Sequence, residues 1–331
     1  MLETYPDDAC NVDSIYDVSQ LKRISLQNTL LEQSGMNESQ AWTIKRLLDW
    51  TSEFFASHKT DSPRLAAEVL LAEALGCQRI ELYTQFDREP DEAQRSLFRE
   101  WVSRHAQGEP VAYLVGHREF YSLRFAVDAS VLIPRPETEH LVSEVIQRAK
   151  SVGQESLSIA DVGTGSGAIA IALAKHLPQA TITAIDISRA ALEVAKKNAT
   201  SHQVLGQIQL IESDLFAQVP ADLRFHFIVS NPPYIGQHER ATVAENVLKY
   251  EPATALFAPG EDGTTLVRQL IQLAPNWLHP AGWLLIEVSP IISAQALEIL
   301  NQSGQFRDTR LVKDLSRLDR VLIGQLAEKS D

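Results

Sequence analysis

Five short apolar runs, separated by segments with helical periodicity, constrain the fold of this chain more than any other feature. The runs are residues 159–162, 181–185, 208–211, 225–229 and 283–288. Short buried strands that alternate with helices are typical of α/β proteins, in which right-handed crossovers build a mostly parallel sheet. Two closely spaced runs, near residues 309–312 and 320–323, are predicted to form an antiparallel hairpin at the sheet edge. The pattern therefore predicts a seven-stranded α/β domain.

The 331 residues are enough for this domain and a smaller one before it. Between about residues 40 and 105 apolar side chains recur at helical spacing, as in the pair Leu97 and Trp101. Asp61, Ser62 and Pro63 supply a capping residue and an early proline for one of these helices. We therefore expect a helical bundle ahead of the sheet.

The predicted boundaries follow changes in this periodicity. Residues 1–38 are polar and are expected to be a poorly ordered extension, and residues 39–108 form the helical bundle. Two extended stretches, near 112–115 and 123–127, predict a β-hairpin connector over residues 109–131. The α/β domain then covers residues 132–327.

Composition limits the classes of function. The chain has no apolar run of about 18 residues and an acidic N-terminus, so we expect a cytoplasmic protein that does not enter a membrane. Its two cysteines, Cys10 and Cys77, have no metal-ligand or disulfide spacing, and no metal is expected. A net charge of -13 repels a nucleic-acid backbone, so no direct nucleic-acid partner is expected.

A glycine-rich turn follows the first apolar run. Its cofactor-binding candidates are Gly163, Thr164, Gly165, Ser166 and Gly167. Alternate glycines allow a sharp turn and leave no Cβ between the backbone and a ligand. An ordinary tight turn and a dinucleotide site are the alternatives, but the G-x-G-x-G spacing and the position past the chain's midpoint favour S-adenosyl-L-methionine.

The next two strands end in acidic residues that suit a nucleoside. Asp186 can accept both ribose hydroxyls, although a helix cap is its alternative role. Asp214 can accept the adenine amino group, although it could also be a solvated loop acid. Either Leu215 or Phe216 is expected to cover the adenine ring.

The fourth strand ends in Asn231-Pro232-Pro233-Tyr234. An amide nitrogen is a poor nucleophile, so its N–H groups need acceptors that fix its orientation and stabilise the developing positive charge. The Asn231 side-chain oxygen and the Pro232 carbonyl can accept these two N–H bonds, and Tyr234 can stack on a planar substrate. The alternative is a Pro-Pro turn capped by Asn231. The pattern favours methyl transfer to a planar nitrogen, with Asn231, Pro232 and Tyr234 as catalytic candidates.

These motifs, in this order, resemble the HemK/PrmC family of protein-(glutamine-N5) methyltransferases over about residues 45 to 325. The resemblance also rests on residues 108–113, 132–139, 250–252, 260–263, 313–315 and 319–321. It implies a Rossmann-like class I methyltransferase domain, preceded by a helical domain that helps to grip a class I peptide-chain release factor. The substrate is then the glutamine of a Gly-Gly-Gln tripeptide.

The resemblance assigns the glycine loop, Asp186, Leu215 and Asn231 to the cofactor, and Asn231 to Tyr234, including Pro233, to the glutamine. Three other functions remain open at this point. They are a glutamine methyltransferase acting on a large-subunit ribosomal protein, an adenine-N6 nucleic-acid methyltransferase, and a non-catalytic module with a cofactor fold.

Overall fold

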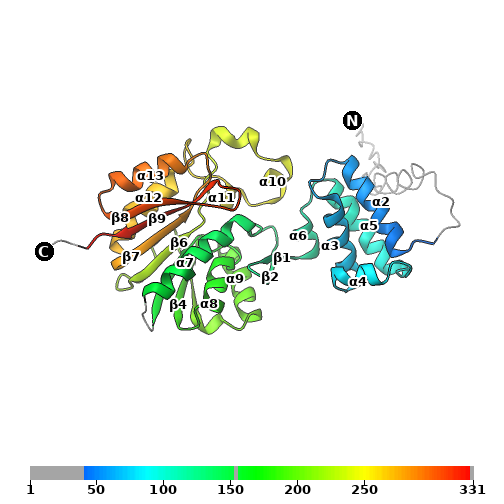
Figure 1. Cartoon of the computed structure of the whole chain (residues 1–331), viewed down its shortest axis with the longest axis horizontal. Coiled ribbons are helices and arrows are strands. Elements are labelled where there is room, and N and C mark those ends of the chain that lie inside the picture. The colour runs from blue at the N-terminus through cyan, green and yellow to red at the C-terminus, as the bar shows by residue number, and fades with distance from the viewer. Residues whose placement is uncertain (1–40, 153–155, 329–331) are drawn as a thin grey trace, which may run out of the picture.

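A seven-stranded mixed sheet forms the centre of the larger domain within residues 41–152 and 156–328, the part of the chain that the computed structural model describes (Figure 1). The extension predicted over residues 1–38 lies outside the described residues. The strands are β3 (Leu157–Val162), β4 (Ala180–Asp186), β5 (Ile208–Glu212), β6 (Phe225–Ser230), β7 (Leu278–Glu287), β8 (Phe306–Lys313) and β9 (Asp319–Leu326). Their order across the sheet is β5-β4-β3-β6-β7-β9-β8.

The strand order creates a switch point between β3 and β6. The five strands from β5 to β7 are parallel, and β9 pairs antiparallel with both β7 and β8. After β3 the chain moves outward through β4 to β5 and then returns to place β6 on the other side of β3. Ligands bind beyond the carboxyl ends of the strands at such a point. The predicted edge hairpin, β8 with β9, is confirmed.

Helices cover both faces of the sheet. Helices α7 (Glu139–Val152), α8 (Ala168–His176) and α9 (Arg189–Ser201) lie on one face (Figure 1). Helices α12 (Thr265–Leu273) and α13 (Ser293–Gln302) lie on the other. The parallel strands are therefore buried on both faces, which explains why their sequences are continuous apolar runs.

Two crossovers carry additional short helices. The 3₁₀ helix η2 (Leu205–Gln207) precedes β5. Between β6 and β7 the chain forms η3 (Gln237–Thr242), α10 (Glu245–Tyr250) and α11 (Ala253–Leu256) before α12, and then η4 (Ala274–Asn276). A parallel bridge between Ile235 and Phe257 closes the base of the segment that holds η3, α10 and α11.

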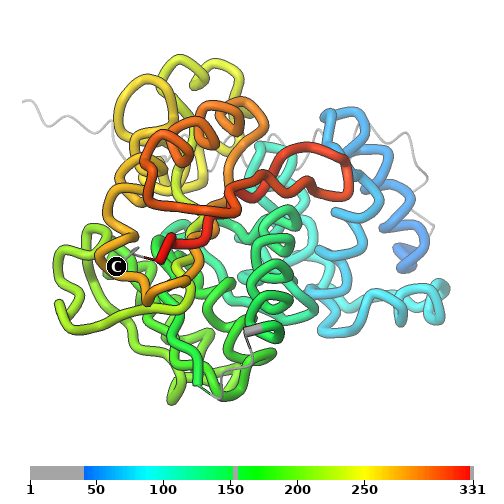
Figure 2. Tube along the Cα trace, turned by 60° about the vertical axis from the view of Figure 1, so that its left-hand side comes forward, coloured from blue at the N-terminus to red at the C-terminus, as the bar shows by residue number. Residues whose placement is uncertain are grey.

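The N-terminal part is helical, as expected, and Figure 2 shows it as the blue-to-cyan tube on one side of the sheet domain. It contains α2 (Ile44–Ser57), α3 (Pro63–Leu75), α4 (Arg79–Thr84) and α5 (Glu92–Ala106). Leu48, Phe55 and Phe98 are among the side chains buried at its core. Asp91 caps α5 by accepting the N–H of Gln94 at 2.8 Å. This part therefore has its own hydrophobic core.

The connector differs in part from its prediction. Residues predicted as the first extended stretch form a short helix, α6 (Val111–Val115). Pro110 precedes this helix, and Gly116 ends it in the left-handed conformation at φ +77°. The hairpin forms instead from β1 (His117–Phe120) and β2 (Leu123–Ala126). The prediction of a strand at 112–115 is therefore wrong, because the proline and glycine at its ends favour a helical turn.

Asn198 on α9 fixes the hairpin to the sheet domain. Its carboxamide exchanges two hydrogen bonds with the backbone of Ala126, at 2.7 and 3.0 Å, and donates a third to the Ser166 carbonyl at 2.9 Å. Asn198 is 2% exposed, so these bonds form away from water. One buried side chain thus joins the connector to the glycine loop.

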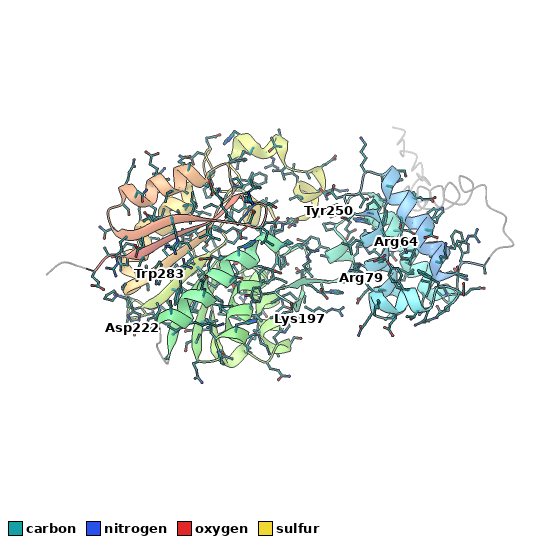
Figure 3. All side chains as sticks on the ribbon, in the orientation of Figure 1. Arg64, Arg79, Lys197, Asp222, Tyr250 and Trp283 are labelled. Atoms are coloured by element: carbon teal, nitrogen blue, oxygen red, sulfur yellow. The ribbon has the colours of Figure 1, made fainter. Side chains whose placement is uncertain are left out.

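Further contacts join the helical part to the connector and to α10. Glu73 on α3 accepts a hydrogen bond from Arg124 on β2 at 3.0 Å. Tyr250, labelled in Figure 3, lies where α10 approaches the helical part, and its hydroxyl donates to the Gln107 carbonyl at 3.5 Å. Arg64 and Arg79, also labelled there, both donate to the buried carboxylate of Glu68 within the helical part.

No helix within the described residues is long and apolar enough to cross a membrane.

Candidate functional site

A cavity of about 430 Å³ opens at the switch point between β3 and β6. This volume falls within the range that small-molecule sites occupy. The sequence-predicted residues in its lining are Gly163, Thr164, Gly165, Ser166, Asp186, Asp214, Leu215, Asn231, Pro232 and Pro233. The structure thus brings residues from four separate strand ends to one site.

The glycine loop joins β3 to α8. A Cβ on Gly165 would meet no heavy atom of the described residues within 4 Å, so its side faces open space. A Cβ on Gly167 would lie 3.0 Å from Ile171 and 3.2 Å from Ala195, so this glycine permits close packing below the loop. Gly167 lies outside the cavity lining as the described residues define it. The two glycines therefore serve different purposes, one toward the cavity and one toward the helices.

Most backbone N–H groups of the loop donate to the protein itself. The N–H groups of Gly163 and Thr164 donate to the Ile185 carbonyl at 2.8 and 2.9 Å. The Gly165 N–H donates to the Asp186 carboxylate at 2.8 Å, and the Gly167 N–H donates to the Thr164 carbonyl at 2.9 Å. A phosphate would need such N–H groups free. The loop therefore suits a nucleoside without phosphate groups better than a dinucleotide.

A buried carboxyl group supports the loop from below. Asp161 in β3 is fully buried, and its Oδ2 atom accepts hydrogen bonds from the Thr164 hydroxyl at 2.7 Å and the Ala170 N–H at 3.1 Å. Burial raises the pKa of Asp161 to about 7, although these two hydrogen bonds oppose the shift. Asp161 thus ties the start of the loop to the start of α8.

Asp186 ends β4 beside the loop. Its Oδ2 atom accepts the Gly165 N–H, and its Oδ1 atom accepts the Ser188 N–H at 2.9 Å. Burial raises the pKa of this carboxyl, and the two N–H groups act in the opposite direction. Each carboxylate oxygen can accept more than one hydrogen bond. Asp186 can therefore keep both protein contacts and still accept hydroxyl groups from a ligand.

The residues after β5 separate into cavity and core positions. Asp214 and Leu215 line the cavity, and Leu215 adopts a positive φ of 48°. The Phe216 ring instead stacks on Trp277 at a centroid distance of 5.0 Å, within the core. Leu215 is therefore the apolar side chain of this pair that a ligand in the cavity can contact.

Asn231 follows β6 directly opposite the glycine loop. Val162 and Ser230 are paired in the sheet, so Gly163 and Asn231 leave neighbouring strands at the same level. A Cβ on Gly163 would lie 4.0 Å from the Asn231 carbonyl oxygen. The Asn231 Nδ2 atom donates to the Thr138 hydroxyl oxygen at 3.1 Å. The carboxamide oxygen of Asn231 is thereby left to accept from a substrate.

The two prolines and Tyr234 lie at different depths. Pro232 and Pro233 line the cavity, and Pro232 is buried. Tyr234 is half-buried against the hydrophobic core between the sheet and helices α12 and α13, and it does not belong to the cavity lining formed by the described residues. Burial raises the pKa of the Tyr234 hydroxyl to about 12. The stacking of Tyr234 on a substrate therefore stays a prediction.

Thr138, Glu287 and Arg135 are polar residues near the turn at Asn231 that were not predicted to have a role. Thr138 and Glu287 are 4% and 1% exposed, and burial raises the pKa of Glu287 to about 7. Arg135 donates to the buried carboxylate of Glu251 at 2.6 Å. The sequence signal for Glu287 was its place at the end of an apolar strand, where an unpaired charge is costly.

Among the described residues, no cluster of His, Cys, Asp and Glu side chains could hold a metal ion.

Both the helical part and the sheet domain of the chain match known proteins. Residues 46–116 match the PrmC N-terminal domain, and residues 138–261 match the methyltransferase small domain. A release factor glutamine methyltransferase from Rhodopirellula baltica is 47% identical over 288 residues, which cover 86% of this chain and 97% of that protein. The chain belongs to the release factor glutamine methyltransferase family. The predicted family and the predicted class I methyltransferase fold are both confirmed.

Other members and more distant proteins are also similar. A release factor glutamine methyltransferase from Chlorobaculum tepidum is 41% identical over 87% of this chain and 98% of its own length. A solved structure of a methyltransferase from Pyrococcus furiosus is 16% identical, with a TM-score of 0.46, and the match covers 68% of this chain and 97% of that one. The two matched family domains lie in the helical part and in the sheet domain.

Proposed function

We propose that this protein transfers a methyl group from S-adenosylmethionine to a glutamine side-chain nitrogen in the Gly-Gly-Gln motif of class I peptide-chain release factors. One observation carries the proposal. The pairing of β3 with β6 places the glycine loop and Asn231 on the same cavity, so a cofactor and a planar amide can meet there. Membership of the release factor glutamine methyltransferase family supports the choice of substrate.

The lining of the cavity supports the adenosine part of the cofactor as its occupant. The open side of Gly165 leaves room for a ligand against the loop backbone. Asp186 would accept the ribose hydroxyls, Asp214 would accept the adenine amino group, and Leu215 would cover the ring. Thr164 would act indirectly, because its hydroxyl already donates to Asp161. The commitment of loop N–H groups to protein acceptors supports this nucleoside over one that carries phosphates.

The chain's part in the reaction is to orient the amide nitrogen. When bound, the cofactor supplies an electrophilic methyl carbon on a sulfonium. The Asn231 Oδ1 atom and the Pro232 carbonyl would accept the two N–H bonds of the glutamine, which aligns its nitrogen for in-line transfer and stabilises its developing charge. Pro233 would narrow the site beside the amide. As the nitrogen takes the methyl group, the sulfonium would become a neutral thioether. The nitrogen would then lose its proton to water, so no base is needed beforehand.

The helical part would help to hold the release factor. We assign substrate recognition to residues 39–108, the connector to residues 109–131, and catalysis to residues 132–327. Cross-linking of the full-length chain to a release factor should link residues 39–108 to the factor. Cross-links confined to residues 132–327 would assign recognition to the sheet domain alone. Such an enzyme would act in the cytoplasm, where release factors meet ribosomes.

Parallel methylation reactions test the proposed substrate. The enzyme and labelled cofactor are incubated separately with a release factor, a large-subunit ribosomal protein and DNA. Label in the release factor alone is expected, because the relatives are release factor glutamine methyltransferases and a net charge of -13 disfavours nucleic acid. Label found in DNA or the ribosomal protein and missing from the release factor would refute the proposal.

A further inference from the structure

The buried carboxyl group of Glu287 lies beside the turn that begins at Asn231. Ser230, the last residue of β6, pairs with Ile286, so Asn231 just after β6 lies level with Glu287, the last residue of β7. Glu287 is 1% exposed, and its Oε2 atom has no hydrogen-bond partner among the described residues. A buried carboxyl group with an unsatisfied oxygen is costly, so its position beside Asn231 calls for a functional account.

Thr138 connects the two side chains. Its hydroxyl oxygen accepts a hydrogen bond from Asn231 Nδ2 at 3.1 Å, and the same side chain lies near enough to the Glu287 carboxyl to lower the pKa of that group. Thr138 is 4% exposed and belongs to the 3₁₀ helix η1 (Pro136–Thr138) just before α7. A hydroxyl has a single hydrogen to donate and lone pairs to accept with. If the Thr138 hydroxyl donates its hydrogen to Glu287, it can therefore only accept from Asn231.

We propose that Glu287 is a positioning residue that acts through the Thr138 hydroxyl to orient the Asn231 carboxamide, so that its oxygen faces the substrate nitrogen. An ionised Glu287 accepts the hydroxyl hydrogen of Thr138. The hydroxyl then presents a lone pair to Asn231, which must turn its NH₂ group toward Thr138. This inference rests on the proposed function, because it concerns the group that accepts the substrate N–H.

The opposite protonation state removes this constraint. A protonated Glu287 can donate its own hydrogen to Thr138, which frees the threonine hydroxyl hydrogen to point at Asn231. The carboxamide can then turn its oxygen toward Thr138 and its NH₂ group toward the cavity. Two donors would face each other there, because the substrate amide also presents N–H groups. Turnover should fall when Glu287 is protonated.

The charges that face Glu287 come from several elements. Arg320 on β9 and Arg135 ahead of η1 favour its ionised form, whereas Glu137 in η1 favours the neutral form. Tyr234, after β6, stays neutral because burial raises its pKa to about 12. Burial is the largest effect and brings the pKa of Glu287 to about 7. Both forms of the carboxyl group are therefore populated near neutral pH.

Nuclear magnetic resonance of the cofactor-free protein tests the linkage without an activity assay. In protein labelled with ¹⁵N at asparagine, the Asn231 side-chain NH₂ signals are identified by their absence in Asn231→Asp. Their chemical shifts should change with a midpoint near pH 7 in the wild type. The change should vanish in Glu287→Gln and in Thr138→Val, and persist in Thr138→Ser, which keeps the hydroxyl. A titration that survives in both Glu287→Gln and Thr138→Val would overturn the proposal.

The pH dependence of kcat gives the second test. Wild-type kcat should rise through about pH 7, whereas Glu287→Gln should be flat and about three- to tenfold lower at pH 8, as for one lost hydrogen bond. Thr138→Ser, which keeps the hydroxyl, should show the wild-type pH profile. Cofactor affinity should be the same in the wild type and in both variants. The same ascending limb in Glu287→Gln would refute the positioning role. Failure of the wild type to methylate release factor would refute the proposed function instead, and the resonance titration would still report on Glu287.

Discussion

The Asp186 carboxylate accepts the backbone N–H of Gly165 at 2.8 Å, which joins the end of β4 to the glycine loop after β3. Its other oxygen accepts the Ser188 N–H at the start of α9. One side chain thus holds the loop in shape before any ligand arrives. A preformed site loses less conformational entropy on binding, which favours affinity.

Replacement of Asp186 should weaken cofactor binding. In Asp186→Asn an NH₂ group takes the place of one carboxylate oxygen and faces either the Gly165 or the Ser188 N–H. The substitution also removes one oxygen that would accept the ribose hydroxyls. We expect the cofactor Kd to rise by about tenfold or more, measured by calorimetry. Glu212→Gln is the control, because Glu212 pairs with Asp186 in the sheet but is exposed. An equal loss in both variants would indicate a general charge effect.

Removal of the Asn231 side chain should act on the chemical step. Asn231→Ala deletes the oxygen that is proposed to accept the substrate N–H, so kcat should fall by about two orders of magnitude or more. Single-turnover methylation of a release factor measures this step directly. Asn301→Ala, an exposed change on α13, should leave turnover unaffected. Near-normal turnover in Asn231→Ala would remove this residue from the mechanism.

Asn198 should contribute more to stability than to chemistry. Asn198→Ala removes three hydrogen bonds and leaves the buried Ser166 carbonyl and the half-buried backbone groups of Ala126 without these partners. We expect the free energy of unfolding to fall by about 2 to 4 kcal/mol in urea titrations. The exposed Asn301→Ala again serves as the control. A loss below about 0.5 kcal/mol would show that the hairpin does not depend on this anchor.

Asp161 should make stability depend on pH. Its pKa is about 7 in the folded protein and about 3.9 when unfolded, so the unfolded chain releases this proton first as the pH rises. Unfolding is therefore favoured progressively between about pH 4 and pH 7. As the pH rises from 5 to 8, the free energy of unfolding should fall less in Asp161→Asn than in the wild type. The difference between the two falls should be at least about 1 kcal/mol. Parallel pH profiles of the unfolding free energy in the two proteins would contradict this account.

Local patterns made much of the fold and the site predictable. The glycine loop, Asp186 and Asn231 each follow an apolar run directly, and parallel strands bring their carboxyl ends to one edge. The place of each residue at the end of its strand was therefore enough to predict that these residues lie close together. The seven strands followed from the same alternation.

Other features depend on contacts between distant parts of the chain. Thr138 and Asn231 are 93 residues apart, and neither residue signals the other in the sequence. Leu215 and Phe216 are adjacent, and only the packing of Trp277 shows that Phe216 belongs to the core. The strand predicted at 112–115 failed for a local reason, because Pro110 and Gly116 bound a short helix. Orientation and partner choice thus required the folded structure.

Mass spectrometry of a methylated release factor tests the central claim most directly. The factor is incubated with the full-length enzyme and S-adenosylmethionine, digested, and the Gly-Gly-Gln peptide is fragmented to locate the added methyl group. We predict one methyl group on the glutamine side chain, and about a hundredfold less methylated peptide when Asn231→Ala enzyme is used for the same short time. An unmodified glutamine after prolonged incubation with folded enzyme that binds the cofactor would contradict the proposed function.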